Sequence, residues 1–134
     1  MNTCAKLFID NLNSKDLHFS VEEKEGGKTI VQIPFDNRNH RFVFTGDNGE
    51  YLSMYTLFES VPQDNFADAL IVCNQLNAKY KWLKFYIDED FDLMIDDDAI
   101  LDPSNAADEA FELLYRRVNL LKEVKPTLMK AIYG

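Results

Sequence analysis

The fold is decided by residues 28–58, which read KTIVQIPFDNRNHRFVFTGDNGEYLSMYTLF. This stretch contains three runs rich in β-branched and aromatic residues, at 28–35, 41–45 and 51–58, and such residues favour extended strands. Asn37-Arg38-Asn39 and Asp47-Asn48-Gly49, which separate the runs, are typical turn sequences. The stretch therefore predicts an antiparallel meander.

Further strands are predicted on both sides of this meander. Residues 17–22 alternate apolar and polar side chains, which indicates a strand with one buried face, and Gly26-Gly27 then forms a hairpin turn. A second hairpin is predicted from residues 81–87 and 92–95 around an acidic turn at 88–91.

Three helices complete the expected fold. Apolar spacing predicts a helix over residues 3–14 and another from Pro62 to about Tyr80. The second helix has an expected apolar face of Phe66, Leu70, Cys73, Leu76 and Tyr80. Asp102 and Pro103 are expected to begin the last helix, and Pro126 to kink or break it. We therefore expect a single α+β domain over residues 1–134, an antiparallel sheet with helices on one face, in the order α-ββββ-α-ββ-α.

Composition narrows the function classes. The 134 residues are 46% hydrophobic, enough for one globular core, and 23 acids against 14 bases give a net charge of −9. A polyanion repels nucleic acid and anionic membranes, so neither is an expected partner. The chain has no apolar run as long as a membrane span, and its first residues lack the basic and apolar regions of a signal peptide. Cys4 and Cys73 are isolated in the sequence, which is typical of reduced thiols. A cytoplasmic location is therefore expected.

The strongest candidate for ion chemistry is acidic. Eleven carboxylates and no Lys or Arg lie between Asp88 and Glu112. The segment begins like a calcium loop, but Leu93 stands where such a loop needs Gly and Ala99 where it needs a bidentate Glu. Asp96-Asp97-Asp98 is open to two interpretations, a loose cation site or a solvated loop before a helix, and the second is favoured. No metal ligand and no cofactor are assigned.

No catalytic group is predicted either. His18 and His40 fall outside any known catalytic spacing and are expected on the wet face of a strand or in a turn. Cys73 is expected to be a buried hydrophobe and Cys4 to be more exposed. Asn74 and Asn77 are expected to bond the backbone of the following strand. The protein is therefore not expected to be an enzyme.

The second half of the chain resembles a known family. Residues 72–77, VCNQLN, are followed by residues 82–87, WLKFYI, the acidic turn, and a terminal helix with a late Pro126. This pattern resembles the YbjN family of bacterial proteins, described as sensory-transduction regulators with a fold like that of type III secretion chaperones. The resemblance implies a cytosolic α+β protein, often dimeric, without established catalytic residues.

We therefore expect a non-catalytic protein-binding module, a chaperone-like or regulatory adaptor in bacterial signalling that acts as a homodimer with an unidentified protein partner. The strand at 51–58 is apolar on both faces, so its two faces need two different covers. Met54 is expected to face the helices, together with Leu52 and Phe58. The predicted interaction surface is the other face: Tyr51, Tyr55 and Leu57. The alternative is a small-ligand sensor with a pocket between the sheet and the second helix, near Tyr80 and Trp82.

Overall fold

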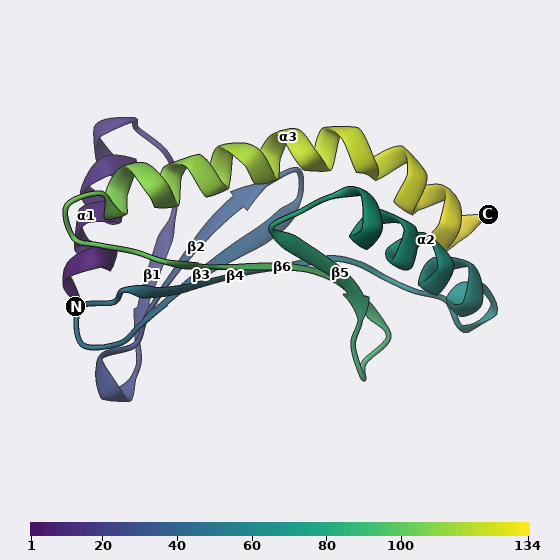
Figure 1. Ribbon diagram of the computed structural model, residues 1–134, viewed down its shortest axis with the longest axis horizontal. Coiled ribbons are helices and arrows are strands. Elements are labelled where there is room, and N and C mark those ends of the chain that lie inside the picture. The colour runs from purple at the N-terminus through teal and green to yellow at the C-terminus, as the bar shows by residue number, and fades with distance from the viewer.

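Three helices cover one face of a six-stranded antiparallel sheet in the computed structural model, which describes residues 1–134 (Figure 1). The elements are α1 (Thr3–Ser14), β1 (Ser20–Glu23), η1 (Glu25–Gly27), β2 (Thr29–Phe35), β3 (Arg38–Thr45), β4 (Tyr51–Ser60), η2 (Gln63–Asn65), α2 (Phe66–Lys79), β5 (Leu83–Ile87), β6 (Asp92–Ile100) and α3 (Ala106–Tyr133). The predicted α+β class and the order α-ββββ-α-ββ-α are confirmed. None of the helices combines the length and the hydropathy that a bilayer span requires.

The sheet has the strand order β1-β2-β3-β4-β6-β5. The first four strands form the predicted meander, in which each strand pairs with the next. The second hairpin joins it through β6, which pairs with β4 from Tyr51↔Ile100 to Ser60↔Asp92. β5 is therefore the last strand at one edge of the sheet, and β1 is the last strand at the other.

Two strands differ from the sequence-based expectation. β1 is shorter than the predicted 17–22 strand and all four of its residues are exposed, so the expected buried face is wrong. β6 is longer than predicted, because it continues beyond Ile95 through Asp96-Asp97-Asp98 to Ile100. The solvated loop expected at these three aspartates is wrong. Pairing with β4 along the whole length of β6 offsets the poor strand propensity of Asp.

α3 differs from the sequence-based expectation in where it begins and in the effect of Pro126. The helix begins at Ala106, because Asp102 accepts hydrogen bonds from the backbone and side chain of Ser104 in the preceding turn. Pro126 does not break the helix, which runs on to Tyr133. Lys122, whose carbonyl loses its intrahelical donor at Pro126, is exposed to water, while Val124 and Leu128 are buried and hold the helix in place.

α2 buries a slightly different stripe from the predicted one. Ala69, Cys73 and Leu76 are buried, whereas Leu70 is 43% exposed. Cys73 and Leu76 are buried as predicted, and the stripe shifts only at Leu70, whose place in the core is taken by Ala69. Asn77 bonds the next strand as predicted: its amide donates to Phe85 O (2.9 Å) and accepts from Phe85 N (2.7 Å). Asn74 is exposed and makes no such bond, so that prediction is wrong.

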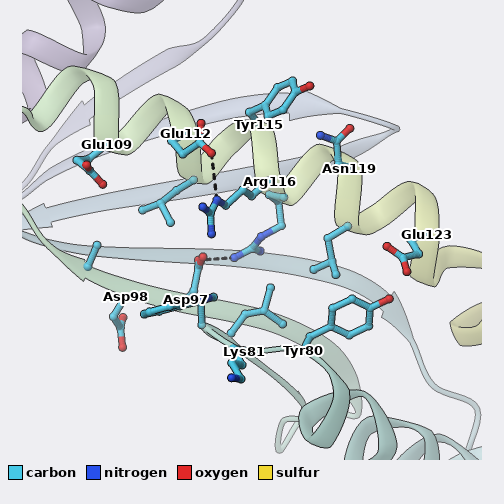
Figure 2. Close-up of a pocket in the computed structure, with 16 residues that line it drawn as sticks. Tyr80, Lys81, Asp97, Asp98, Glu109, Glu112, Tyr115, Arg116, Asn119 and Glu123 are labelled. Atoms are coloured by element: carbon cyan, nitrogen blue, oxygen red, sulfur yellow. Dashed lines mark hydrogen bonds and ion pairs between the residues drawn. The ribbon is translucent and has the colours of Figure 1, made fainter.

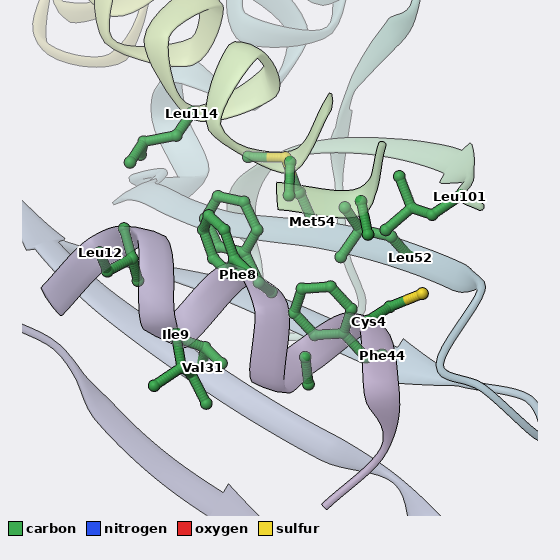
Figure 3. Close-up of a cluster of buried hydrophobic side chains, with 14 of the residues drawn as sticks. Cys4, Phe8, Ile9, Leu12, Val31, Phe44, Leu52, Met54, Leu101 and Leu114 are labelled. Atoms are coloured by element: carbon green, nitrogen blue, oxygen red, sulfur yellow. The ribbon is translucent and has the colours of Figure 1, made fainter. Parts of the chain in front are cut away.

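The core consists of two hydrophobic clusters under the two ends of α3. The first lies between α1, the first half of α3 and β2 to β4, and includes Phe8, Phe42 and Met54 (Figure 3). The second lies between α2, the second half of α3 and the β5–β6 hairpin, and includes Phe85 and Leu121. α3 therefore spans both clusters as one helix (Figure 1).

Candidate functional site

The face of the sheet opposite the helices carries a row of exposed apolar side chains. Tyr51 is 55% exposed, Leu57 47% and Ile100 80%. Tyr51 pairs with Ile100 at one end of β4 and Leu57 pairs with the half-buried Met94 near the other, and the Ser53–Asp98 pair lies between Tyr51 and Tyr55 on the same face. We call Tyr51, Tyr55, Leu57, Met94 and Ile100 the outer-face patch. Single exposed apolar residues are ordinary, but several of them on one sheet face are typical of an interaction surface.

The structure places the predicted interaction residues in this patch. Tyr51, Tyr55 and Leu57 all lie on the outer face of β4, whereas Met54 is buried against the helices as expected. Tyr55 is only half-buried and pairs with Asp96. Asp96 Oδ2 accepts a hydrogen bond from the Tyr86 hydroxyl (2.6 Å), and burial raises the pKa of both groups. The patch is thus an apolar surface with a tyrosine–carboxylate pair inside it.

A groove of about 630 Å³ lies between α3 and the β6 side of the sheet (Figure 2). Its apolar walls come from both sides, with Leu113 and Leu120 on α3 and Leu83 at the start of β5. Tyr80 and Trp82 lie at one end, as the sensor interpretation expected, but the wall is α3 and not the second helix. The predicted position between the sheet and α2 is therefore wrong. α2 packs directly on β5 and α3.

The groove is rich in charged side chains. Five acids line it, Asp97, Asp98, Glu109, Glu112 and Glu123, against three bases, Lys81, Arg116 and Arg117. Glu112 bonds Arg116 (3.1 Å) and Asp97 bonds Arg117 (2.5 Å), as the dashed lines in Figure 2 show. Glu123 pairs with Lys79 (3.9 Å), so Asp98 and Glu109 among the acids, and Lys81 among the bases, have no ion-pair partner.

A buried polar network lies at the floor of the groove, between the two hydrophobic clusters. The Arg117 guanidinium is fully buried and donates to Asp97 Oδ1, to Thr56 Oγ1 (2.7 Å) and to Ile95 O (2.8 Å). His40 Nδ1 lies 2.7 Å from the same threonine oxygen, and its Nε2 lies 3.4 Å from Phe35 O. The predictions of a wet or turn position for His40 and of a solvated Asp97 are therefore wrong.

The donors of the network fix the state of His40. Arginine only donates, so Thr56 Oγ1 accepts from Arg117. The Phe35 carbonyl only accepts, so His40 Nε2 carries the proton and donates to it, and in the neutral ring Nδ1 accepts from the Thr56 hydroxyl. Burial and the nearby Arg117 charge lower the pKa of His40 to about 4, which keeps the ring neutral. Burial likewise raises the pKa of Asp97, against the opposing pull of Arg117.

Neither cysteine is placed for thiol chemistry. Cys73 is buried as predicted, and burial raises the pKa of its thiol to about 11. Cys4 is also fully buried, so its expected exposure is wrong, and burial raises the pKa of its thiol too. It occupies the buried stripe of α1 with Phe8 and Leu12 (Figure 3). Both residues act as small core hydrophobes.

The acidic turn brings three carboxylates close together. Oxygens of Asp88, Asp90 and Asp92 lie within 4.8 Å of one another. However, Asp88 Oδ1 accepts hydrogen bonds from the backbone N–H groups of Asp90 and Asp92, both at 3.0 Å, so this oxygen already shapes the turn.

Comparison with known proteins identifies the family. The family model described as "YbjN: Putative bacterial sensory transduction regulator" matches residues 9–119. The chain belongs to the YbjN family. A search of curated proteins found no match to it. The YbjN match covers all six strands, α2 and the first half of α3, and therefore both the outer-face patch and most of the groove.

Sequence reasoning overlooked the buried network, although the sequence contains signals for it. Strand alternation places His40 on the same face as Phe42, and places Thr56 between the inward Met54 and Phe58. Helical spacing places Arg117 on the stripe of Leu114 and Leu121 in α3. Each polar residue thus sits at an apolar position of its own periodic pattern, which is the mark of a buried polar layer.

Proposed function

We propose that this YbjN protein is a non-catalytic protein-binding module that acts as a homodimer, a chaperone-like or regulatory adaptor. The exposed outer-face patch is the observation that carries this proposal. Aromatic and apolar side chains on a sheet face, with a polar surround, suit a protein interface because tyrosine buries area while its hydroxyl stays hydrogen-bonded. The family description as a sensory transduction regulator is consistent with a binding role.

The state of the potential catalytic groups supports the non-catalytic part of the proposal. His40 has both ring nitrogens engaged and a low pKa, and both thiols are buried with raised pKa values. A general base or nucleophile needs access to substrate and a pKa near the working pH. None of these three groups meets both requirements.

The test compares two exposed tyrosines of nearly equal accessibility. Tyr51 in the outer-face patch is 55% exposed and Tyr133 at the end of α3 is 58% exposed, so aspartate at either site leaves the fold intact. We expect Tyr51→Asp and Leu57→Asp to shift the protein from dimer to monomer in light scattering coupled to size exclusion, and Tyr133→Asp to leave the dimer unchanged. A wild-type protein that is monomeric at 100 µM, or a dimer that tolerates both patch variants, overturns the proposed interface.

Tyr55→Asp is a poorer test than the sequence suggested. Tyr55 pairs with Asp96, so the new carboxylate would lie directly opposite an existing buried one. Like charges in paired positions destabilise a sheet, and a loss of dimer would then be mixed with a loss of fold. Met54→Asp remains the control for unfolding, because it places a charge in the first hydrophobic cluster.

The second candidate function is a small-ligand sensor, and the groove beside α3 favours it. Its volume of about 630 Å³ lies within the range of ligand pockets, and Tyr80, Trp82 and Leu83 supply apolar contact area. Native mass spectrometry of protein purified from its own host discriminates the two candidates, because a bound small molecule supports the sensor and a stoichiometric protein supports the adaptor.

A further inference from the structure

A stretch of the sheet edge in β6 has neither a neighbouring strand nor a side-chain hydrogen bond to its backbone. The β6 ladder with β4 continues to Tyr51↔Ile100, but its ladder with β5 stops at Leu83↔Asp97. Residues 98–100 of β6 therefore have no strand on the β5 side. The chain turns away at this point because Trp82, which would be next in register, has φ +77°. A positive φ at tryptophan is rare, so the departure from the sheet is a specific feature.

The orientation of the backbone at this edge follows from one hydrogen bond. Leu101 N donates to Glu50 O (2.7 Å), so the backbone groups of Leu101 are directed toward the β4 side. Because alternate residues of an antiparallel strand point to opposite sides, the N–H and C=O groups of Asp98 and Ile100 point to the open side. These four groups are ready to pair with another strand.

The other edges of the sheet are protected. Asn77 of α2 bonds both backbone groups of Phe85 in β5, so the β5 edge is covered at its centre. β1 carries Glu22 and Glu23, and charged side chains on a short edge strand discourage pairing. The uncovered segment at Asp98–Ile100 opens instead into the groove beside α3, which Asp98 and Ala99 line. Figure 2 shows the strand that carries Asp98 below α3, with the Asp98 side chain directed away from the helix.

We propose that the groove binds an extended peptide segment that adds as a strand to β6 at Asp98–Ile100 and carries alternating apolar and basic side chains. This proposal deepens the protein-binding function proposed above and rests on it. The groove follows α3 from Glu109 to Glu123, fifteen residues that span about 21 Å of helix. At about 3.3 Å per residue, that length accommodates roughly six residues of extended chain.

The side chains of the groove select the chemistry of the segment. Its apolar side chains face α3 and pack toward Leu113 and Leu120, and its Lys or Arg side chains, on the other face of the added strand, reach the unpaired carboxylate of Asp98, which pairs with Ser53 on the outer face of the sheet. Asp98 has no ion-pair partner, and a chain of net charge −9 attracts a basic partner and repels an acidic one. Strand addition supplies affinity through the backbone, and the pockets supply specificity.

The experiment uses a synthetic capped hexapeptide that alternates lysine and valine, with two matched peptides. One replaces lysine by glutamate, and the other carries N-methyl groups on the amides of one edge, which blocks pairing. Trp82 is the only tryptophan of the chain, is 77% exposed and lines the groove, so its fluorescence reports binding without a label. We expect the basic peptide to bind at least tenfold more tightly than either matched peptide, and to slow hydrogen exchange at the Asp98 and Ile100 amides.

Two protein variants complete the test. Asp98→Lys inverts the charge at an exposed position and is expected to lower the affinity for the basic peptide at least tenfold. The control, Glu89→Lys, lies in the β5–β6 turn outside the groove and is expected to change this affinity less than twofold. Asp98→Pro removes an edge N–H while keeping the β4 ladder, and a thermal melt establishes that it is folded.

Each remaining outcome overturns the proposal. No binding of the basic peptide at 1 mM excludes the groove as a peptide site. Equal binding of the N-methylated peptide, or unchanged exchange at Asp98 and Ile100, excludes strand addition and supports a pocket for small molecules. Dissociation of a wild-type dimer by the basic peptide, measured by light scattering, assigns the edge to a second copy of this chain. The outer-face dimer is measured separately with Tyr51→Asp, so its failure and the failure of the groove are distinguishable.

Discussion

Replacing Arg117 with methionine tests the buried network most directly. The substitution keeps the length of the side chain but removes the donors to Thr56 Oγ1, Ile95 O and Asp97 Oδ1. Asp97 is then a buried carboxylate without a counter-charge. Removing one partner of a buried ion pair costs about 3–5 kcal/mol, a large part of the roughly 5–15 kcal/mol that stabilises a domain. We expect a loss of that size in urea unfolding followed by circular dichroism.

The neighbouring arginine provides the control. Arg116 bonds Glu112 on the exposed side of the same helix, where its side chain is 62% accessible. Arg116→Met should change the free energy of unfolding by less than about 0.5 kcal/mol, because exposed pairs four residues apart contribute little. A double-mutant cycle with Asp97→Leu should recover at least about 2 kcal/mol, because the double variant no longer buries a charge.

The pH dependence of the variant supplies an independent check. Burial raises the pKa of Asp97, and loss of the Arg117 charge removes the interaction that opposes this shift. The native variant then holds a proton that the unfolded chain releases, so its stability should increase as the pH falls toward that raised pKa. A loss below about 1 kcal/mol for Arg117→Met, or additive effects in the cycle, would refute the network as a unit of stability.

Three further predictions follow from individual sites. His40 has a pKa of about 4 in the native protein against 6.5 in the unfolded chain, so its contribution to stability is complete above pH 6.5 and declines by up to about 3 kcal/mol as the pH falls to 4. The difference in unfolding free energy between wild type and His40→Gln, measured in urea across that pH range, should show this decline. A difference that stays constant with pH would contradict it. Gly49→Ala should lower the free energy of unfolding by about 1–3 kcal/mol more than Gly26→Ala does, as measured by chemical denaturation. Both glycines have positive φ, but only at Gly49 would the new Cβ clash with the side chain of Asn2, which caps α1. Equal losses of stability would show that the Asn2 side chain moves aside without cost. Calcium at 1 mM should leave the melting temperature unchanged, since Asp88 Oδ1 already accepts two hydrogen bonds within its own turn. A calcium site with a Kd of about 10 µM would increase the free energy of unfolding by roughly 2.7 kcal/mol, so a melting temperature higher by several degrees would reveal such a site.

Local pattern was sufficient to predict most of the fold. The alternation in residues 28–58 and the turns that interrupt it depend on neighbours in sequence, and the structure confirms each strand. The pattern was less informative where tertiary packing opposes propensity. Pro126 continues a helix because buried residues on both sides hold it, and Asp96-Asp97-Asp98 stay extended because β4 pairs with them.

The groove was only partly predictable. Tyr80 and Trp82 stood out in the sequence as aromatic residues beside lysines, and they do line the groove. Its other wall depends on where α3 crosses the sheet, which is a matter of long-range packing. The pairing of Arg117 with Asp97, twenty residues apart, depends on the same crossing, so residue type alone did not reveal it.

The way α3 joins the two hydrophobic clusters has a consequence for synthesis of the protein. α3 leaves the ribosome after the sheet and the other two helices, yet it supplies one wall of both clusters. The β2–β4 meander has only local contacts to make and can form early with α1 against it, whereas the part of its apolar inner face that α1 does not cover stays open until translation reaches α3. The nascent chain therefore passes through a stage with a partly open hydrophobic sheet, which closes only when α3 packs on it.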